Sequence, residues 1–180
     1  KSGSGKSTLL NLIGGLDSVT DGNIFVDGEN ITGMSAKEKA QYRNEKIGYI
    51  FQNYQLLPAL TVEENICMPL MIRNKKVDNN FIEDLMSKLG ILECRNKLPS
   101  ELSGGEQQRT AIARALATKP QIILADEPTG NLDSENGEKV ISLIKELKLP
   151  TQTVIMITHN VELVKHATRV IKIKDGQIKE

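Results

Sequence analysis

Short runs of apolar residues alternate along the chain with longer segments in which apolar residues recur at helical spacing. Two of the short runs, residues 122–125 and 154–157, are apolar throughout, which is typical of parallel strands buried on both faces. An alternation of strands and helices favours an α/β fold with a parallel sheet. The other expected strands are residues 22–28, 47–51 and 170–173, and the expected helices are residues 6–14, 36–44, 135–147 and 161–166.

The middle of the chain departs from this alternation. From Thr61 to about Thr118 the sequence predicts helices and no strand. Thr61 with Glu64, and Ser103 with Glu106, form capping-box patterns that begin helices. Residues 78–89 form an amphipathic helix pattern that ends at a glycine. We therefore expect one domain over residues 1–180, with an α/β core (1–56 and 112–180) and an inserted helical subdomain (57–111). A turn at residues 174–177 should join two short strands.

The composition excludes several classes of protein. The chain of 180 residues carries 23 basic and 23 acidic residues and has a formal net charge of zero, which argues against broad binding of nucleic acid. Three tyrosines and three phenylalanines are its only aromatic residues, too few for a base-stacking platform. Cys67 and Cys94 lack the paired spacing of a zinc knuckle or a disulfide scaffold. No apolar run approaches the roughly 18 residues of a membrane helix.

The start of the chain carries a phosphate-binding pattern. Residues 1–8, Lys-Ser-Gly-Ser-Gly-Lys-Ser-Thr, match the end of the G-x-x-x-x-G-K-[ST] loop and run directly into an apolar helix. The glycines let backbone N–H groups turn toward a phosphate chain, and a helix N-terminus favours the same negative charge. We expect Lys6 to contact the β- and γ-phosphates and the Ser7 hydroxyl to bind Mg²⁺. The plain structural alternative is a linker rich in serine and glycine.

A second motif agrees with a nucleotide site. Residues 122–127, Ile-Ile-Leu-Ala-Asp-Glu, form a buried strand that ends in two acids. Ligands of open α/β sheets bind at the carboxyl edge of the strands. We expect Asp126 to hold Mg²⁺ through water and Glu127 to accept a proton from the attacking water. Two solvated acids at a strand end are the structural alternative.

The third motif, Leu-Ser-Gly-Gly-Glu-Gln at residues 102–107, opens a helix with two glycines. Ser103 can cap this helix together with Glu106, so an ordinary capping box is one interpretation. Gly104 and Gly105, however, cost helix stability. This cost suggests that a ligand approaches the backbone closely, and an anion is the natural candidate for a helix N-terminus.

These three motifs, in this order, resemble those of the nucleotide-binding subunit of an ATP-binding-cassette (ABC) transporter, over essentially the whole chain. The resemblance identifies Gln52 with the Q-loop glutamine that touches Mg²⁺ and the attacking water. It identifies Asp133 with the D-loop, and His159, after the apolar run 154–157, with the switch histidine that contacts the γ-phosphate.

The resemblance implies a P-loop NTPase core and a full set of site residues. The catalytic residues are Glu127, His159 and Gln52, and the Mg²⁺ ligands are Ser7, Gln52 and Asp126. ATP is bound in cis by Ser2, Gly3, Ser4, Gly5, Lys6, Ser7 and Thr8, and in trans by Ser103, Gly104, Gly105, Glu106 and Asp133 of a second chain.

The same resemblance implies a head-to-tail homodimer that holds two ATP molecules with Mg²⁺. Its expected partners are transmembrane permease subunits and not nucleic acid, and its expected place is the cytoplasmic face of the plasma membrane, as a peripheral protein. The N-terminal antiparallel β-subdomain of such subunits is expected to be largely missing, so that the sequence is an N-terminally truncated fragment.

Residues 125–133, Ala-Asp-Glu-Pro-Thr-Gly-Asn-Leu-Asp, are similar to the branch of lipoprotein-releasing ATPases and of macrolide or antimicrobial-peptide exporters. We therefore expect an ATPase that powers the export or release of lipoproteins, peptides or macrolide-like compounds. Two alternatives remain open. One is a cell-division ATPase that signals through a membrane partner without transport, and the other is a soluble ABC ATPase that acts on nucleic acid or ribosomes.

Overall fold

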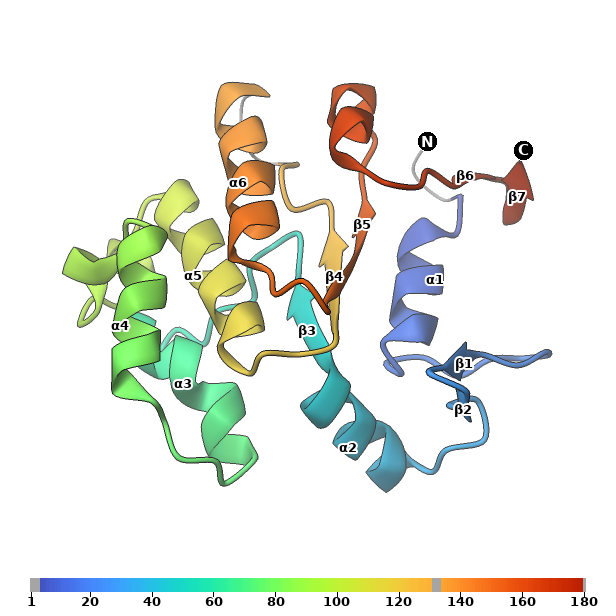
Figure 1. Ribbon diagram of the computed structural model, residues 1–180, viewed down its shortest axis with the longest axis horizontal. Helices are drawn as coiled ribbons and strands as arrows, with labels where there is room; N and C mark the ends of the chain where they lie inside the picture. Colours follow the sequence, from blue (N-terminus) through green and yellow to red (C-terminus); the bar gives the residue numbers. More distant parts are fainter. Residues whose placement is uncertain (1–3, 131–133, 180) are drawn as a thin grey trace.

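A three-stranded parallel sheet forms the centre of the computed structural model, which describes residues 4–130 and 134–179 (Figure 1). Its strands are β3 (Ile47–Ile50), β4 (Ile122–Asp126) and β5 (Thr153–Ile157), in the order β3-β4-β5. Leu124 in the central strand pairs with Tyr49 on one side and with Ile155 on the other. The parallel α/β core predicted from the apolar runs is therefore confirmed.

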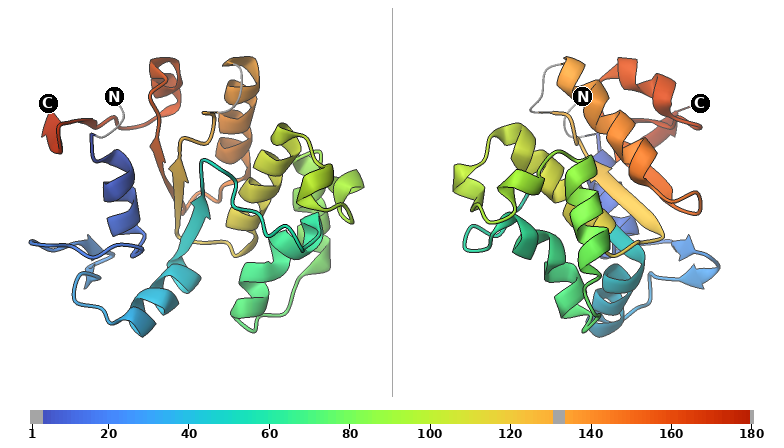
Figure 2. Two further views of the ribbon diagram at one scale, coloured as in Figure 1. Left: turned by 180° about the vertical axis from the view of Figure 1, so that it is seen from behind. Right: turned by 60° about the vertical axis from the view of Figure 1, so that its left-hand side comes forward.

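Alternate residues of each strand face opposite sides of the sheet. In β4, Ile123 and Ala125 pack against one group of helices, and Leu124 packs against the other. All three side chains are completely buried. A strand that is buried on both faces needs apolar residues at every position, which explains the continuous apolar run in the sequence. Figures 1 and 2 show α1 and α5 on opposite sides of the sheet.

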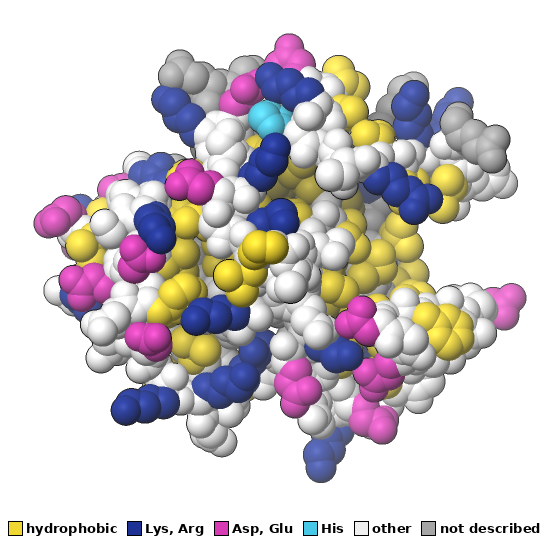
Figure 3. Space-filling model, viewed as in Figure 1, with side chains coloured by type: hydrophobic (Ala, Val, Ile, Leu, Met, Phe, Trp, Pro, Cys, Tyr) yellow, Lys and Arg dark blue, Asp and Glu magenta, His cyan; other side chains and the backbone are white. Residues whose placement is uncertain are grey.

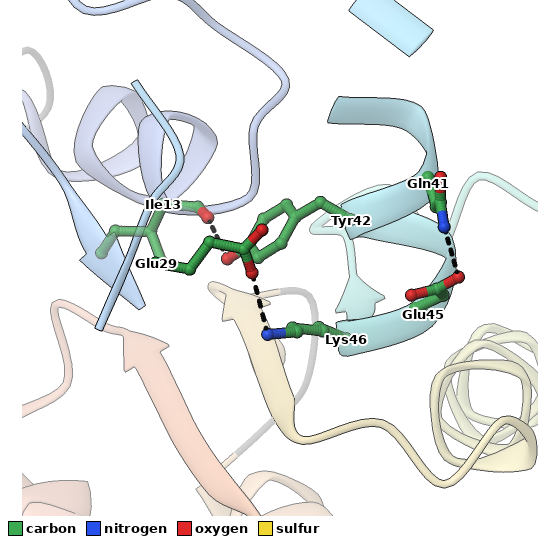
Figure 4. Close-up of polar contacts among 6 residues, drawn as sticks. All are labelled: Ile13, Glu29, Gln41, Tyr42, Glu45 and Lys46. Atoms are coloured by element: carbon green, nitrogen blue, oxygen red, sulfur yellow. Dashed lines mark hydrogen bonds and ion pairs between the residues drawn. The ribbon is translucent and has the colours of Figure 1, made fainter. Parts of the chain in front are cut away.

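One face of the sheet is covered by α1 (Lys6–Ile13) and α2 (Ala36–Lys46). Two tyrosines fix the position of α1. The Tyr42 hydroxyl donates to the carbonyl of Ile13 at 2.9 Å (Figure 4), and the Tyr49 hydroxyl donates to Asn11 Oδ1 at 2.6 Å. Burial is the main cause that raises the pKa of each tyrosine to about 12, so both remain neutral donors at physiological pH.

The other face carries the larger apolar cluster, which α3, α4, α5 and α6 share with the sheet. Between β3 and β4 the chain forms only helices, as the sequence predicts. Thr61 and Ser103 each complete a capping box, with Glu64 and Glu106 respectively. The helices of this segment are α3 (Val62–Ile72), α4 (Asn79–Lys88) and α5 (Gly104–Ala117), with the 3-10 helices η1 (Leu92–Cys94) and η2 (Pro99–Glu101) before α5. Helix α6 (Ser134–Leu147) follows β4.

The expected boundary after Ala111 between helical subdomain and core falls inside α5. This helix contacts both α3 and β3, so it belongs to both parts of the molecule. The division of the chain into residues 1–56, 57–111 and 112–180 stays a prediction.

Three expected elements differ in detail from the structure. The strand predicted over residues 22–28 is a hairpin of β1 (Phe25–Val26) and β2 (Glu29–Asn30), because Asp27 and Gly28 adopt the positive φ angles of a two-residue turn. The helix expected at 161–166 is the 3-10 helix η3 (Val161–His166). The strand expected from residue 170 begins at Lys172. It is β6 (Lys172–Lys174), which pairs with β7 (Gln177–Lys179) around the predicted turn.

The described part of the chain holds no helix that is both long and apolar enough to cross a membrane. Basic and acidic side chains are interspersed on the face seen in Figure 3, as a net charge of zero leads one to expect. The cysteines are buried and are not joined by a disulfide.

Gly48 in β3 is required by the close packing of α5 on the sheet. A Cβ atom at this position would lie 2.4 Å from the carbonyl oxygen of Ala115 and 2.8 Å from Pro120 Cγ. Because the first of these atoms is backbone, the helix itself would have to move. We expect Gly48→Ala to destabilise the protein by about 3 kcal/mol, the upper end of ordinary overpacking costs. Thermal unfolding measures this effect, and Gly33→Ala, whose Cβ meets only open space, is the control. Equal melting temperatures of the two variants would contradict the packing argument.

Candidate nucleotide site

The residue that caps the N-terminus of α1 is a glycine in a left-handed backbone conformation. Gly5 caps the helix with a φ of +86°, a left-handed conformation that glycine adopts without strain. The preceding residue, Ser4, is buried, and its carbonyl accepts a hydrogen bond from the backbone N–H of Gly176 at 3.2 Å. Lys6, Ser7 and Thr8 then form the first turn of α1. The predicted ligands Ser2 and Gly3 lie outside the described residues.

The Ser7 hydroxyl donates a hydrogen bond to Asp126 Oδ1 at 3.1 Å, although 119 residues separate the two in sequence. Asp126 is the last residue of β4, so the start of α1 meets the carboxyl edge of the sheet at this bond. A hydroxyl and a carboxylate are the hard oxygen donors that Mg²⁺ accepts, and this ion usually takes few protein ligands beside substrate phosphates and water. The pair therefore fits the predicted magnesium site. Among the described residues no cluster of three or more His, Cys, Asp or Glu side chains offers an all-protein site.

Glu127 and His159 face each other at the same edge of the sheet. His159 Nδ1 donates to Glu127 Oε2 at 2.5 Å. Glu127 follows β4 directly with a φ of +48°, and strained backbone of this kind clusters at functional sites. The backbone N–H of Glu127 donates to the carbonyl of Ile157, the last residue of β5. The His159 side chain is 69% exposed and the Glu127 side chain 18%, so the histidine is the more accessible member of the pair.

Gln52 lies beside the loop that follows Glu127. It comes two residues after β3, and its amide nitrogen is 3.6 Å from the point that a Cβ of Gly130 would occupy. The ends of β3, β4 and β5 thus bring Gln52, Glu127 and His159 to one edge, next to Ser7 and Asp126. The predicted D-loop residue Asp133 lies outside the described residues.

The N-terminus of α5 is held by a compact set of hydrogen bonds around Glu106. Glu106 Oε2 accepts from the backbone N–H of Ser103 at 2.7 Å and from its hydroxyl at 2.6 Å. Glu106 Oε1 accepts from the buried Cys94 thiol at 3.2 Å. These bonds, mainly those from Ser103, lower the pKa of Glu106 to about 2. The backbone N–H groups of Gly104 and Gly105 precede the first helical i→i−4 bonds, so they are placed to meet a ligand.

Within one chain, this helix start does not join the other predicted site residues. The N-termini of α1 and α5 both point to the carboxyl edge of the strands, but the helices lie on opposite sides of the sheet (Figures 1 and 2). The contact of Ser103 from a second chain with a nucleotide bound at Ser7 stays a prediction.

Arg114 in α5 is a site neighbour that the sequence motifs do not point to. It is only 7% exposed, and its guanidinium donates to the backbone of the Gln52 loop. The sequence does contain a signal for it, because the arginine interrupts the run Ala-Ile-Ala-Arg-Ala-Leu-Ala at residues 111–117. An arginine in an apolar helix face needs a buried partner.

The family model described as ABC transporter matches residues 1–130. The chain belongs to the ABC transporter family. Like the family's nucleotide-binding subunits, it is an ATP-binding subunit and an ATPase. The resemblance inferred from the motifs is thereby confirmed.

Two similar ABC proteins show how far the likeness extends. An uncharacterized ABC transporter ATP-binding protein of Thermotoga maritima is 45% identical over 179 residues, which cover 98% of this chain and 76% of that protein. The macrolide export ATP-binding/permease protein MacB of Mannheimia succiniciproducens is 46% identical over 180 residues, which cover 99% of this chain but 28% of that protein.

Solved structures of ABC proteins confirm the fold. Two dimeric structures of the ATP-binding cassette MJ0796, one of them bound to ADP and Pi, each superimpose with a TM-score of 0.88 at 40% identity. Each match covers all of this chain and 81% of the other. The P-loop NTPase core with inserted helices is thus the architecture of an ABC cassette.

Proposed function

We propose that this ABC ATPase drives a membrane permease by binding ATP between two copies of the chain and hydrolysing it there. The observation that carries the proposal is the hydrogen bond between Ser7 and Asp126, because it joins the phosphate-binding helix start to the acidic end of β4. Glu127 and His159, paired at the same edge, supply the groups that hydrolysis needs.

ATP binding rests on the start of α1. Its phosphates meet the N-terminus of the helix, where backbone N–H groups and the helix dipole favour negative charge. Lys6 contacts the β- and γ-phosphates, and Ser7, Asp126 and Gln52 hold Mg²⁺, which neutralises phosphate charge when bound. Ser4, Gly5 and Thr8 complete the loop.

Hydrolysis rests on Glu127. Its carboxylate accepts a proton from the attacking water as the oxygen of that water attacks the γ-phosphorus. Gln52 orients this water, and His159 leaves its contact with Glu127 to reach the γ-phosphate. A correctly placed general base such as Glu127 raises the rate about 10²–10⁴-fold.

A second chain completes each site. Ser103, Gly104 and Gly105 of that chain approach the γ-phosphate with a second helix N-terminus, so that phosphate charge is neutralised from both sides. The two dimeric MJ0796 structures support this arrangement, since that cassette is 40% identical to this chain. Loss of the γ-phosphate removes the contacts across the interface and loosens the dimer.

The coupled process is the export or release of lipoproteins, peptides or macrolide-like compounds. The match to MacB, which is named as a macrolide export ATP-binding/permease protein, supports this class of cargo. We place the dimer at the cytoplasmic face of the plasma membrane, bound to transmembrane permease subunits.

Lys6→Ala tests the nucleotide site in the complete protein, reconstituted with its permease in lipid vesicles. We expect the variant to bind ATP at least about tenfold more weakly, because a hydrogen bond to a charged group is worth about 1.5–3 kcal/mol. Cargo-stimulated hydrolysis should fall with it. Equilibrium binding of ATP and phosphate release measure the two effects.

Lys37→Ala is the matched control, because Lys37 lies in the first turn of α2 and is exposed. Unchanged ATP affinity in Lys6→Ala would refute the site. A wild-type complex whose hydrolysis responds to none of the three cargo classes would refute the proposed cargo but not the ATPase.

A further inference from the structure

The loop that carries Gln52 contains an unusual turn. Tyr54 and Gln55, neither of which is glycine, follow one another with φ angles of +57° and +48°. Side chains disfavour this left-handed region, and two adjacent residues in it are rarer still. Such a turn persists only where its surroundings hold it in place.

The side chain of Arg114 holds this turn in place. Its Nη1 donates to the carbonyl of Gln55 at 2.6 Å, and its Nη2 donates to the carbonyl of Tyr54 at 2.7 Å. The two acceptors thus belong to the two strained residues themselves. The planar guanidinium offers two parallel donors in a fixed geometry, which a lysine cannot reproduce.

Arg114 has no other hydrogen-bond partner, and no carboxylate pairs with it, within residues 4–130 and 134–179. Burial lowers its pKa. A buried cation is costly unless its donors are satisfied, so the two carbonyls of the turn are what makes this position tolerable for arginine. The hydrogen bonds between Arg114 and the turn therefore depend on the guanidinium group and on these two carbonyls.

The same turn touches α5 a second time, at its start. The Tyr54 hydroxyl lies 3.5 Å from the point that a Cβ of Gly104 would occupy. The turn therefore lies next to the first part of α5 at Gly104 and is hydrogen-bonded to its last part through Arg114. Two residues before the turn, the Gln52 amide lies beside Gly130 in the loop after Glu127.

We propose that Arg114 is a positioning residue that locks the Tyr54–Gln55 turn onto α5, so that Gln52 and the helix start at Gly104 move together. The proposal rests on the proposed function and assigns Arg114 a part in it. The lock fixes Gln52 relative to the hydrolytic site of its own chain. It also links that residue to the glycines that complete the site of the partner chain.

The substitution Gln55→Gly distinguishes this positioning role of Arg114 from a role in core packing alone. Gln55 is exposed, and glycine adopts its positive φ without strain. If Arg114 serves to hold the turn, Gln55→Gly should compensate for the loss of the guanidinium. If Arg114 only fills space in the core, a glycine in the loop cannot compensate.

The experiment measures ATP hydrolysis by the complete, permease-bound protein for Arg114→Met and Arg114→Lys, each with and without Gln55→Gly. We expect Arg114→Met to lower kcat about tenfold with less than about a twofold change in KM, because the ATP contacts of α1 are intact. Gln55→Gly should bring kcat of the double variant to within about threefold of wild type. Arg114→Lys keeps the charge but has only one donor centre, so its kcat should lie between those of wild type and Arg114→Met. It also tests the proposal if the methionine variant does not fold.

Arg73→Met is the matched control. Arg73 also has a pKa lowered by burial, and it donates to the carbonyl of Thr118 at the C-terminal end of α5, but none of its hydrogen bonds goes to the Gln52 loop. Its kcat should stay within about twofold of wild type. Wild-type kcat in Arg114→Met and Arg114→Lys, or no recovery by Gln55→Gly in folded protein, would overturn the lock. Normal turnover in Glu127→Gln would instead overturn the proposed function.

Discussion

Glu127→Gln should lower ATP turnover of the complete protein by about 10²–10⁴-fold, the range that a positioned general base contributes. Glutamine has the size of glutamate and can still accept the hydrogen bond from His159 Nδ1. It cannot accept a proton from water. ATP binding should be unchanged, because the contacts at Lys6 and Ser7 do not involve this side chain. The variant should therefore collect in the ATP-bound dimer, which size-exclusion chromatography with Mg-ATP detects alongside phosphate release.

Glu138→Gln provides the matched control for Glu127→Gln. Glu138 in α6 is also a carboxylate that pairs with a basic side chain, in this case Lys165. It is not one of the predicted site residues, so its removal should leave turnover within about twofold of wild type. If Glu127→Gln hydrolysed ATP as fast as Glu138→Gln, Glu127 would not be the general base.

The sheet and the edge that carries the candidate site could be predicted because they follow from local patterns. Continuous apolar runs mark the strands β4 and β5, since β4 is buried on both faces and β5 packs apolar side chains against both clusters. Parallel strands end at the same edge of a sheet, so polar residues that follow such runs are bound to gather there. Glu127 and His159 meet for this reason. Their roles come from the resemblance of the motifs and not from spacing alone.

Contacts that depend on how helices pack could not be predicted. Arg114 donates to carbonyls that are 59 and 60 residues away in sequence. No local pattern encodes which carbonyl a buried guanidinium will reach. The positive φ angles of Tyr54 and Gln55 are equally hidden, because these residue types normally avoid that region and only tertiary contacts impose it.

The hairpin at Asp27 and Gly28 was missed for a different reason. Asp-Gly is a strong signal for a two-residue turn, and both residues have the positive φ that such a turn requires. The apolar residues before it suggested one longer strand. The turn signal was present in the sequence and should have outweighed the apolar run.

The glycines at the start of α5 are not explained by the fold of the single chain. Gly104 has helical geometry, and a Cβ there would be 3.5 Å from the Tyr54 hydroxyl, an ordinary contact. Alanine would fit and would raise helix stability by up to about 1 kcal/mol. A residue that lowers stability with no steric need in its own chain points to a ligand outside that chain.

Gly104→Ala should therefore raise the melting temperature of the protein, by up to about 2–4 °C, and yet lower ATP turnover by about 10²-fold. Cα–Cβ bonds in a helix tilt toward its N-terminus, so the added methyl group projects into the space where the γ-phosphate of the partner's ATP is proposed to lie. Loss of one preorganised backbone donor costs about 10²–10³ in rate. Differential scanning fluorimetry measures the rise in melting temperature, and phosphate release from the complete protein measures the fall in turnover. Gly33→Ala, exposed and remote from the helix start, should leave turnover unchanged. A Gly104→Ala protein that is more stable and equally active would show that no nucleotide approaches this backbone, and the proposed closure of the site by a second chain would be wrong.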